Sequence, residues 1–204
     1  VSGDLYPENG TVKNVKGVNS VFEPLVITFD TLDGASIRID TSINGRSGLR
    51  FLTAFDTEEY AKIEKYIQSM GTLLLPTENL SDGSTAIDFV EENFVIGETI
   101  AKVENTKGTY EYTDPNTQSV YTVYAMALTE IKDNARAWSA RGYLVVEYAD
   151  GSTQTVYAGY DEAKNSRSVA QVAYLLKTTD PEAYEAMNTA QRKIVDDYAA
   201  DYQG

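Results

Sequence analysis

Apolar and polar residues alternate along most of this chain but recur at helical spacing in a few segments, and this change of period limits the possible folds. In the segment 49–55, Leu49, Phe51 and Thr53 share a face opposite Arg50 and Leu52. Asp150-Gly151 is a turn signal that predicts a hairpin between the two segments beside it. The pattern predicts strands over 22–29, 36–40, 49–55, 72–75, 99–103, 109–112, 120–129, 137–148 and 153–157.

The first helical segment follows the strand at 49–55. Asp56 or Thr57 can cap a helix with acidic residues in its first turn, and apolar residues recur at helical spacing as far as Met70. Gly71 is predicted to end this helix. The segment 78–97 is ambiguous, and Ser84 could cap a short helix within it.

The C-terminal part of the chain has three helical patterns. Ser166 is the expected cap of a helix over 167–177, and Asp180-Pro181 predicts the start of a second helix. A third is expected after Asn188 or Thr189. We therefore predict an α+β fold, in which an antiparallel β-sandwich over 1–160 is interrupted by one helix. A C-terminal cluster of helices over 161–204 packs on it, as one compact unit.

The charge of the chain limits its partners. A formal net charge of −14 argues against nucleic acids and anionic membrane surfaces, which attract clustered Lys and Arg. Neutral ligands such as sugars are not repelled. No run of about 18 apolar residues occurs, so we expect no membrane insertion.

Two residue types with important chemistry are missing. The chain has no cysteine and no histidine, which excludes disulfides, thiolate nucleophiles and Ser-His-Asp triads. We expect no cofactor and no metal. Calcium is conceivable at 82–84 or 114–118, but these short polar stretches are typical of turns.

Three arginines lie in the middle of expected strands: Arg38, Arg50 and Arg141. They could run along an exposed sheet face and pair with nearby carboxylates, namely Asp40, Asp56 or Glu147. Alternatively, a guanidinium could donate to ligand hydroxyls. Arg50 is the better candidate, because its strand leads directly into the loop at Asp56.

Aromatic residues are the second set of candidates. The chain has 15 tyrosines but only 6 phenylalanines, and a tyrosine ring can stack on a sugar while its hydroxyl stays hydrated. Trp138 is the only tryptophan and could be a core residue or a platform for a sugar ring.

A third set lies where the expected sandwich meets the C-terminal helices. Two aromatic residues, two acids, an amide and an arginine fall within eleven residues there, and they could line a pocket or form a solvated connector. These residues are Tyr157, Tyr160, Asp161, Glu162, Asn165 and Arg167.

Four phrases occur in a fixed order along the chain: Ser47-Gly48-Leu49-Arg50-Phe51, Gly71-Thr72-Leu73-Leu74-Leu75-Pro76, Ala140-Arg141-Gly142-Tyr143, and Arg167-Ser168-Val169-Ala170-Gln171-Val172-Ala173. Together they resemble a module of large secreted or cell-surface proteins of Gram-positive gut anaerobes, often found beside carbohydrate-active domains. The resemblance implies a starch-adherence type of carbohydrate-binding module that is secreted or attached to the cell surface. We expect Val1 to begin a mature or trimmed chain.

These observations lead to one expected function and two alternatives. We expect a non-catalytic, monomeric module of a multidomain protein that binds a polysaccharide or oligosaccharide, with an α-glucan favoured by the resemblance. The alternatives are a structural spacer or protein-binding adhesion module, and a glycosidase that uses two carboxylates. The expected ligand-binding residues are Trp138, Tyr157, Tyr160, Asp161, Arg167, Arg50 and Asp56.

Overall fold

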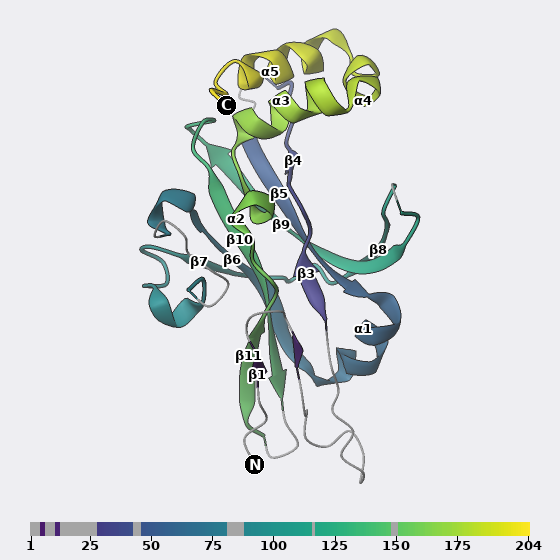
Figure 1. Cartoon of the computed structure of the whole chain (residues 1–204), viewed down its shortest axis with the longest axis vertical. Coiled ribbons are helices and arrows are strands. Elements are labelled where there is room, and N and C mark those ends of the chain that lie inside the picture. The colour runs from purple at the N-terminus through teal and green to yellow at the C-terminus, as the bar shows by residue number, and fades with distance from the viewer. Residues whose placement is uncertain are drawn as a thin grey trace.

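The computed structural model describes residues 5–6, 11–12, 28–42, 46–80, 88–115, 117–147 and 151–204. Two antiparallel sheets pack face to face, and a cluster of helices closes one end of the sandwich (Figure 1). These helices are α3 (Val169–Thr179), α4 (Pro181–Glu185) and α5 (Thr189–Ala199). The α+β class predicted from the sequence is confirmed.

The first sheet has the strand order β3-β5-β9-β8, with β4 also paired to β5. Its strands are β3 (Phe29–Thr31), β4 (Ser36–Ile37), β5 (Ser47–Asp56), β8 (Tyr110–Thr113) and β9 (Val120–Ile131). Most of the expected strand at 22–29 lies outside the described residues. A separate two-stranded sheet pairs β1 (Leu5–Tyr6) with β2 (Thr11–Val12).

The second sheet has the order β11-β10-β6-β7, with β12 also paired to β10. Its strands are β6 (Ile67–Pro76), β7 (Ala101–Glu104), β10 (Trp138–Glu147), β11 (Thr153–Tyr157) and β12 (Ser166–Arg167). The predicted hairpin is confirmed, because β10 and β11 pair antiparallel from Tyr143↔Tyr157 to Glu147↔Thr153.

The core lies between the two sheets. As the alternation predicts, Leu49, Phe51, Thr53 and Phe55 of β5 are all buried, whereas Arg50 on the opposite face is exposed. Phe55 shares one apolar cluster with Leu144 and Val146 of the second sheet. Leu49 and Phe51 share another cluster with Leu74 and Ala140, and Val169 of α3 belongs to it as well. The C-terminal helices therefore pack on the same core as the sheets.

The predicted helix after β5 is shorter than expected. α1 (Thr57–Ile63) begins where predicted, with the Asp56 carboxylate accepting from the N–H groups of Glu58 and Glu59. After one 3-10 turn, the segment from Ile67 onward forms strand β6 and pairs with β10. The helical spacing of Ile67 and Met70 was misleading because pairing with β10 decides their conformation. Gly71 lies inside β6 and does not end a helix.

A third layer covers the outer face of the second sheet. Leu73, Leu75 and Tyr143 of this face pack against Phe89 and Ile100. Within the described part of 78–97, the residues after Val90 form a 3-10 turn, other turns and an isolated bridge between Ile96 and Ile100. The helix expected at Ser84 lies outside the described residues.

This cover layer buries Arg141, which is 0% exposed. The expectation that Arg141 runs along an exposed face is therefore wrong, because the segment that covers it comes from elsewhere in the chain. Arg38 does pair with Asp40 at 3.0 Å, as expected. Arg50 is exposed but donates to Ser36 Oγ at 3.2 Å.

The C-terminal helices begin close to the predicted positions. Ser168 caps α3 by accepting from Gln171 N, so the expected cap at Ser166 is wrong; Ser166 instead begins β12, which pairs with β10. Asp180 caps α4, and Asn188 forms a capping box with Gln191 at the start of α5. No helix in the described parts of the chain is both long and apolar enough to cross a bilayer.

Candidate functional site

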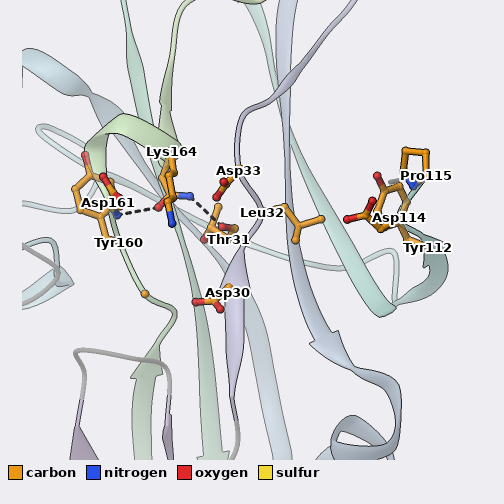
Figure 2. Close-up of a pocket in the computed structure, with 12 residues that line it drawn as sticks. Asp30, Thr31, Leu32, Asp33, Tyr112, Asp114, Pro115, Tyr160, Asp161 and Lys164 are labelled. Carbon is orange, nitrogen blue, oxygen red and sulfur yellow. Dashed lines mark hydrogen bonds between the residues drawn. The ribbon is translucent and has the colours of Figure 1, made fainter. Parts of the chain in front are cut away.

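A cavity of about 620 Å³ lies next to the first residues of the helical part. One wall is β3 and the residues after it; a second is the segment 159–165, which includes α2 (Glu162–Asn165); a third is the end of β8 (Figure 2). The lining residues are Asp30, Thr31, Leu32, Asp33, Tyr112, Asp114, Pro115, Gly159, Tyr160, Asp161, Lys164 and Asn165.

The alternation of side chains along β3 places Asp30 in the cavity. Phe29 and Thr31 are buried on either side of it, so Asp30 points out of the core. Asp30 and Gly159 form an isolated parallel bridge, and a Cβ on Gly159 would lie 2.9 Å from Asp30 Oδ1. Glycine at position 159 therefore lets the carboxylate approach the backbone of the second wall.

The Asp30 carboxyl has a perturbed pKa, although much of the residue is exposed. Partial burial of the carboxyl raises the pKa, while a hydrogen bond from the Gly159 backbone and the charge of Lys164 lower it. The neighbouring Asp33 raises it further. A carboxyl group with a perturbed pKa that also lines a cavity is a candidate for a functional site.

This pKa shift predicts how stability changes with pH. Folding raises the pKa of Asp30 above 3.8, so the folded state favours the protonated carboxyl. The contribution of this group to the free energy of unfolding is therefore complete below pH 3.8 and is lost as the pH rises through the raised pKa. We expect Asp30→Asn to raise Tm at pH 7 and to leave it unchanged near pH 3. Thermal unfolding followed by circular dichroism at both pH values tests this.

Asp40 supplies a control of the opposite sign. Hydrogen bonds from Ser42 and the charge of Arg38 lower its pKa, so Asp40→Asn should reduce Tm at pH 7 and have no effect at low pH. A lower Tm for Asp30→Asn at pH 7 would contradict the account of this carboxyl.

Asn165 fixes the second wall against the first. Its buried side chain donates from Nδ2 to Thr31 O at 2.9 Å, and its Oδ1 accepts from Asp161 N at 2.9 Å. Asp161 in turn caps α2 by accepting from Ala163 N at 3.0 Å. These bonds join β3 to α2, so both walls form a preorganised surface.

Tyr160 is anchored from behind. Its ring meets Phe89 edge-on with centroids 5.0 Å apart, and its hydroxyl lies 2.9 Å from Ser139 Oγ. Ser139 continues this hydroxyl chain to Thr77. Burial raises the pKa of Tyr160 to about 12, so the phenol stays neutral and can both donate and accept.

The charges in the cavity are mostly negative. Four carboxylates, from Asp30, Asp33, Asp114 and Asp161, face a single ammonium group, from Lys164. Such a site repels phosphates and carboxylates but offers many acceptors to hydroxyl groups. Across the described residues, no three acidic side chains are grouped closely enough to hold a metal ion.

The structure brings together only two of the expected ligand-binding residues, Tyr160 and Asp161. Tyr157 is 3% exposed, and its hydroxyl lies 3.2 Å from Glu92 Oε2. Arg167 donates to Ala163 O and Ser166 O, so its guanidinium closes the α2 turn. Asp56 serves as the helix cap described above, and Arg50 lies on β5 outside the cavity.

Trp138 lies away from Tyr160. It packs in the cluster between the sheets, whereas the adjacent Ser139 contacts Tyr160 on the opposite face of β10. Trp138 instead lines a second cavity, of about 330 Å³, formed with the end of β9.

Sequence reasoning missed the residues that β3, β8 and α2 contribute: Asp30, Asp33, Tyr112, Asp114 and Lys164. The Asp30 position alternates with two buried neighbours, which marks it as a side chain facing away from the core. No local signal connects it with Tyr112 or with α2. No family model, no curated protein and no solved structure matches the chain. The function is therefore inferred from the geometry of the site.

Proposed function

We propose that the chain is a non-catalytic carbohydrate-binding module that holds a neutral saccharide in the cavity between β3, α2 and β8. The observation that carries this proposal is the composition of the cavity: two tyrosines, four carboxylates, one lysine and one amide on walls joined by Asn165. Aromatic rings can stack on a pyranose ring while the polar side chains around them hydrogen-bond to its hydroxyl groups.

The chemistry of each wall suits a different part of a sugar. The carboxylates accept hydrogen bonds from vicinal hydroxyls, and Lys164 donates to a ring or hydroxyl oxygen. Tyr112 and Tyr160, on opposite walls, supply apolar ring surface. The site is open and polar, so we expect dissociation constants of roughly micromolar to millimolar.

Within this proposal, the favoured ligand is an α-glucan such as starch or a maltooligosaccharide. This choice, and a location outside the cell or on its surface within a multidomain protein, are supported by the resemblance of the four phrases to surface modules of gut anaerobes. The acidic cavity supports neutral glycans in general, and it disfavours uronic acids and phosphorylated sugars.

Two tyrosines on one strand give a matched test. Tyr112 lines the cavity, whereas Tyr110, two residues earlier in β8, is 46% exposed and lies outside it. We expect Tyr112→Ala to weaken binding about fivefold, because a stacked ring contributes about 1 kcal/mol. Tyr110→Ala should leave the affinity unchanged.

The measurement is affinity electrophoresis in gels containing soluble starch or other neutral polysaccharides, with titration calorimetry on maltooligosaccharides. Circular dichroism confirms that both variants are folded. Equal affinities for Tyr112→Ala and Tyr110→Ala would reject this cavity as the site. Release of reducing sugar from the same polysaccharides would show that the chain is a glycosidase.

A further inference from the structure

Strand β9 has an open edge. It pairs with β5 along almost its whole length, but β8 covers its other edge only from Val120 to Val123. No described strand pairs with this other edge from Tyr124 to Glu130. Unpaired main-chain groups along a strand are a template for a further strand.

The register shows which groups face this edge. On β5, Leu52 O and Gly48 O accept from Leu32 N and Arg38 N, so even-numbered residues of β5 face β3 and β4. The main-chain groups of the odd-numbered residues of β5 therefore bond to β9. Phe51, for example, pairs with Met126. The N–H and C=O groups of Ala125 and Ala127 consequently point to the open edge.

From Ala125 to Thr129, the edge lacks the usual protective devices. Proteins commonly block such edges with lysine, proline or inward-pointing charges. The side chains from Ala125 to Thr129 carry no charge and include no proline, and those of Ala127 and Thr129 are exposed. A bulge interrupts the pairing only at the far end, where Glu130 has φ of 65°.

The cavity beside this edge contains an indole with an unused donor. It is formed by the last residues of β9, including Leu128 and Ile131, together with Trp138 and Arg136. The guanidinium of Arg136 lies 5.4 Å from the Trp138 ring centre. Trp138 Nε1 is buried and has no acceptor among the described residues, although such donors are nearly always bonded.

We propose that the open edge of β9 binds an extended segment of another polypeptide, neutral or basic in charge. Main-chain groups of Ala125 and Ala127 pair with the incoming strand, and a side chain of that strand that carries an acceptor, such as threonine, enters the cavity at Trp138. The formal charge of −14 argues against a second copy of the chain or an acidic strand as the occupant. This interface is independent of the saccharide cavity.

The test uses two synthetic peptides, Lys-Val-Thr-Val-Thr-Val-Lys and its Glu-ended counterpart, added to the whole chain. Trp138 is the only tryptophan, so its fluorescence reports occupation of the cavity. We expect saturable binding of the Lys-ended peptide, and slower hydrogen exchange of the Ala125 and Ala127 amides when it is bound. No saturable change would overturn the proposal, and equal binding of both peptides would overturn its charge preference.

Position 127 offers a matched pair of variants. Ala127→Pro removes the N–H that faces the edge, and proline is tolerated on edge strands, so we expect a folded variant whose affinity is at least about tenfold lower. Ala127→Val keeps the N–H and should bind normally. Equal affinities, or failure of Ala127→Pro to fold, would contradict the assigned register. Concentration-dependent dimers that Ala127→Pro abolishes would assign the edge to a second copy and overturn the proposed occupant.

Discussion

Replacement of Arg141 by methionine is expected to lower the free energy of unfolding by about 4 kcal/mol. The guanidinium is fully buried, with Nε donating to Ala158 O at 2.6 Å and Nη1 donating to Phe89 O at 2.8 Å. Methionine fills similar space but donates no hydrogen bond. Both buried carbonyl groups would lose a charged donor.

The same substitution should also disturb the saccharide cavity. Ala158 directly precedes Gly159 and Tyr160, and Phe89 contacts the Tyr160 ring. Arg141 thus connects the cover layer, the second sheet and one wall of the cavity. Burial lowers its pKa to about 10, so it remains charged at neutral pH.

Arg50 is the matched control, because it also lies in the middle of a strand but is exposed. We expect Arg50→Met to change the free energy of unfolding by no more than about 0.5 kcal/mol. Arg141→Lys should lower the free energy of unfolding nearly as much as Arg141→Met, because the single nitrogen of an ammonium cannot take the places of both Nε and Nη1, which bond two different carbonyl groups. Urea unfolding measures all three, and similar stabilities for Arg141→Met and Arg50→Met would contradict this account.

Gly71→Ala is expected to destabilise the fold by about 3 kcal/mol. A Cβ at this position would lie 2.2 Å from Val103 O and 2.6 Å from the Tyr143 hydroxyl. The nearer atom belongs to the backbone of β7, which pairs with β6 at this point, so relief requires the strand to move. Loosening β7 would also disturb the cover layer.

Gly108→Ala separates this clash from the general effect of removing a glycine. Gly108 has φ of 75°, and nothing lies within 4 Å of the added Cβ. The control should cost about 1 kcal/mol from backbone conformation alone. If urea unfolding finds Gly71→Ala no less stable than Gly108→Ala, the close packing of β6 against β7 is wrong.

Features with a local cause were predictable from the sequence. Asp56, Asp180 and Asn188 cap their helices through bonds to residues two or three positions away, and such signals can be read directly. The inner face of β5 followed from alternation alone. The hairpin of β10 and β11 followed from its turn residues.

Features decided by distant segments were not predictable in this way. Ile67 and Met70 have helical spacing but form a strand, because β10 lies alongside them. Arg141 has the pattern of a surface residue, yet a segment around Phe89 covers it. The position of Trp138 is different, because strand alternation places Trp138 and Ser139 on opposite faces of β10 and so separates Trp138 from Tyr160.

The candidate site was predictable only on one wall. Tyr160 and Asp161 were expected at the junction of strands and helices, because composition marks that loop. Asp30 and Tyr112 join them through sheet topology, since β3 and β8 lie at opposite edges of the first sheet. No pattern in a single sequence predicts that residues from opposite edges of a sheet line the same cavity.

A two-dimensional ¹H–¹⁵N titration of the intact chain with maltoheptaose and a set of other neutral oligosaccharides tests the central claim most directly. We expect at least one sugar to shift, saturably, the amides of 30–33, 112–114 and 159–165, and Tyr112→Ala to weaken these shifts. Saturable shifts confined to other surfaces, or none with any neutral sugar at millimolar concentration, would show that this cavity is not a saccharide site.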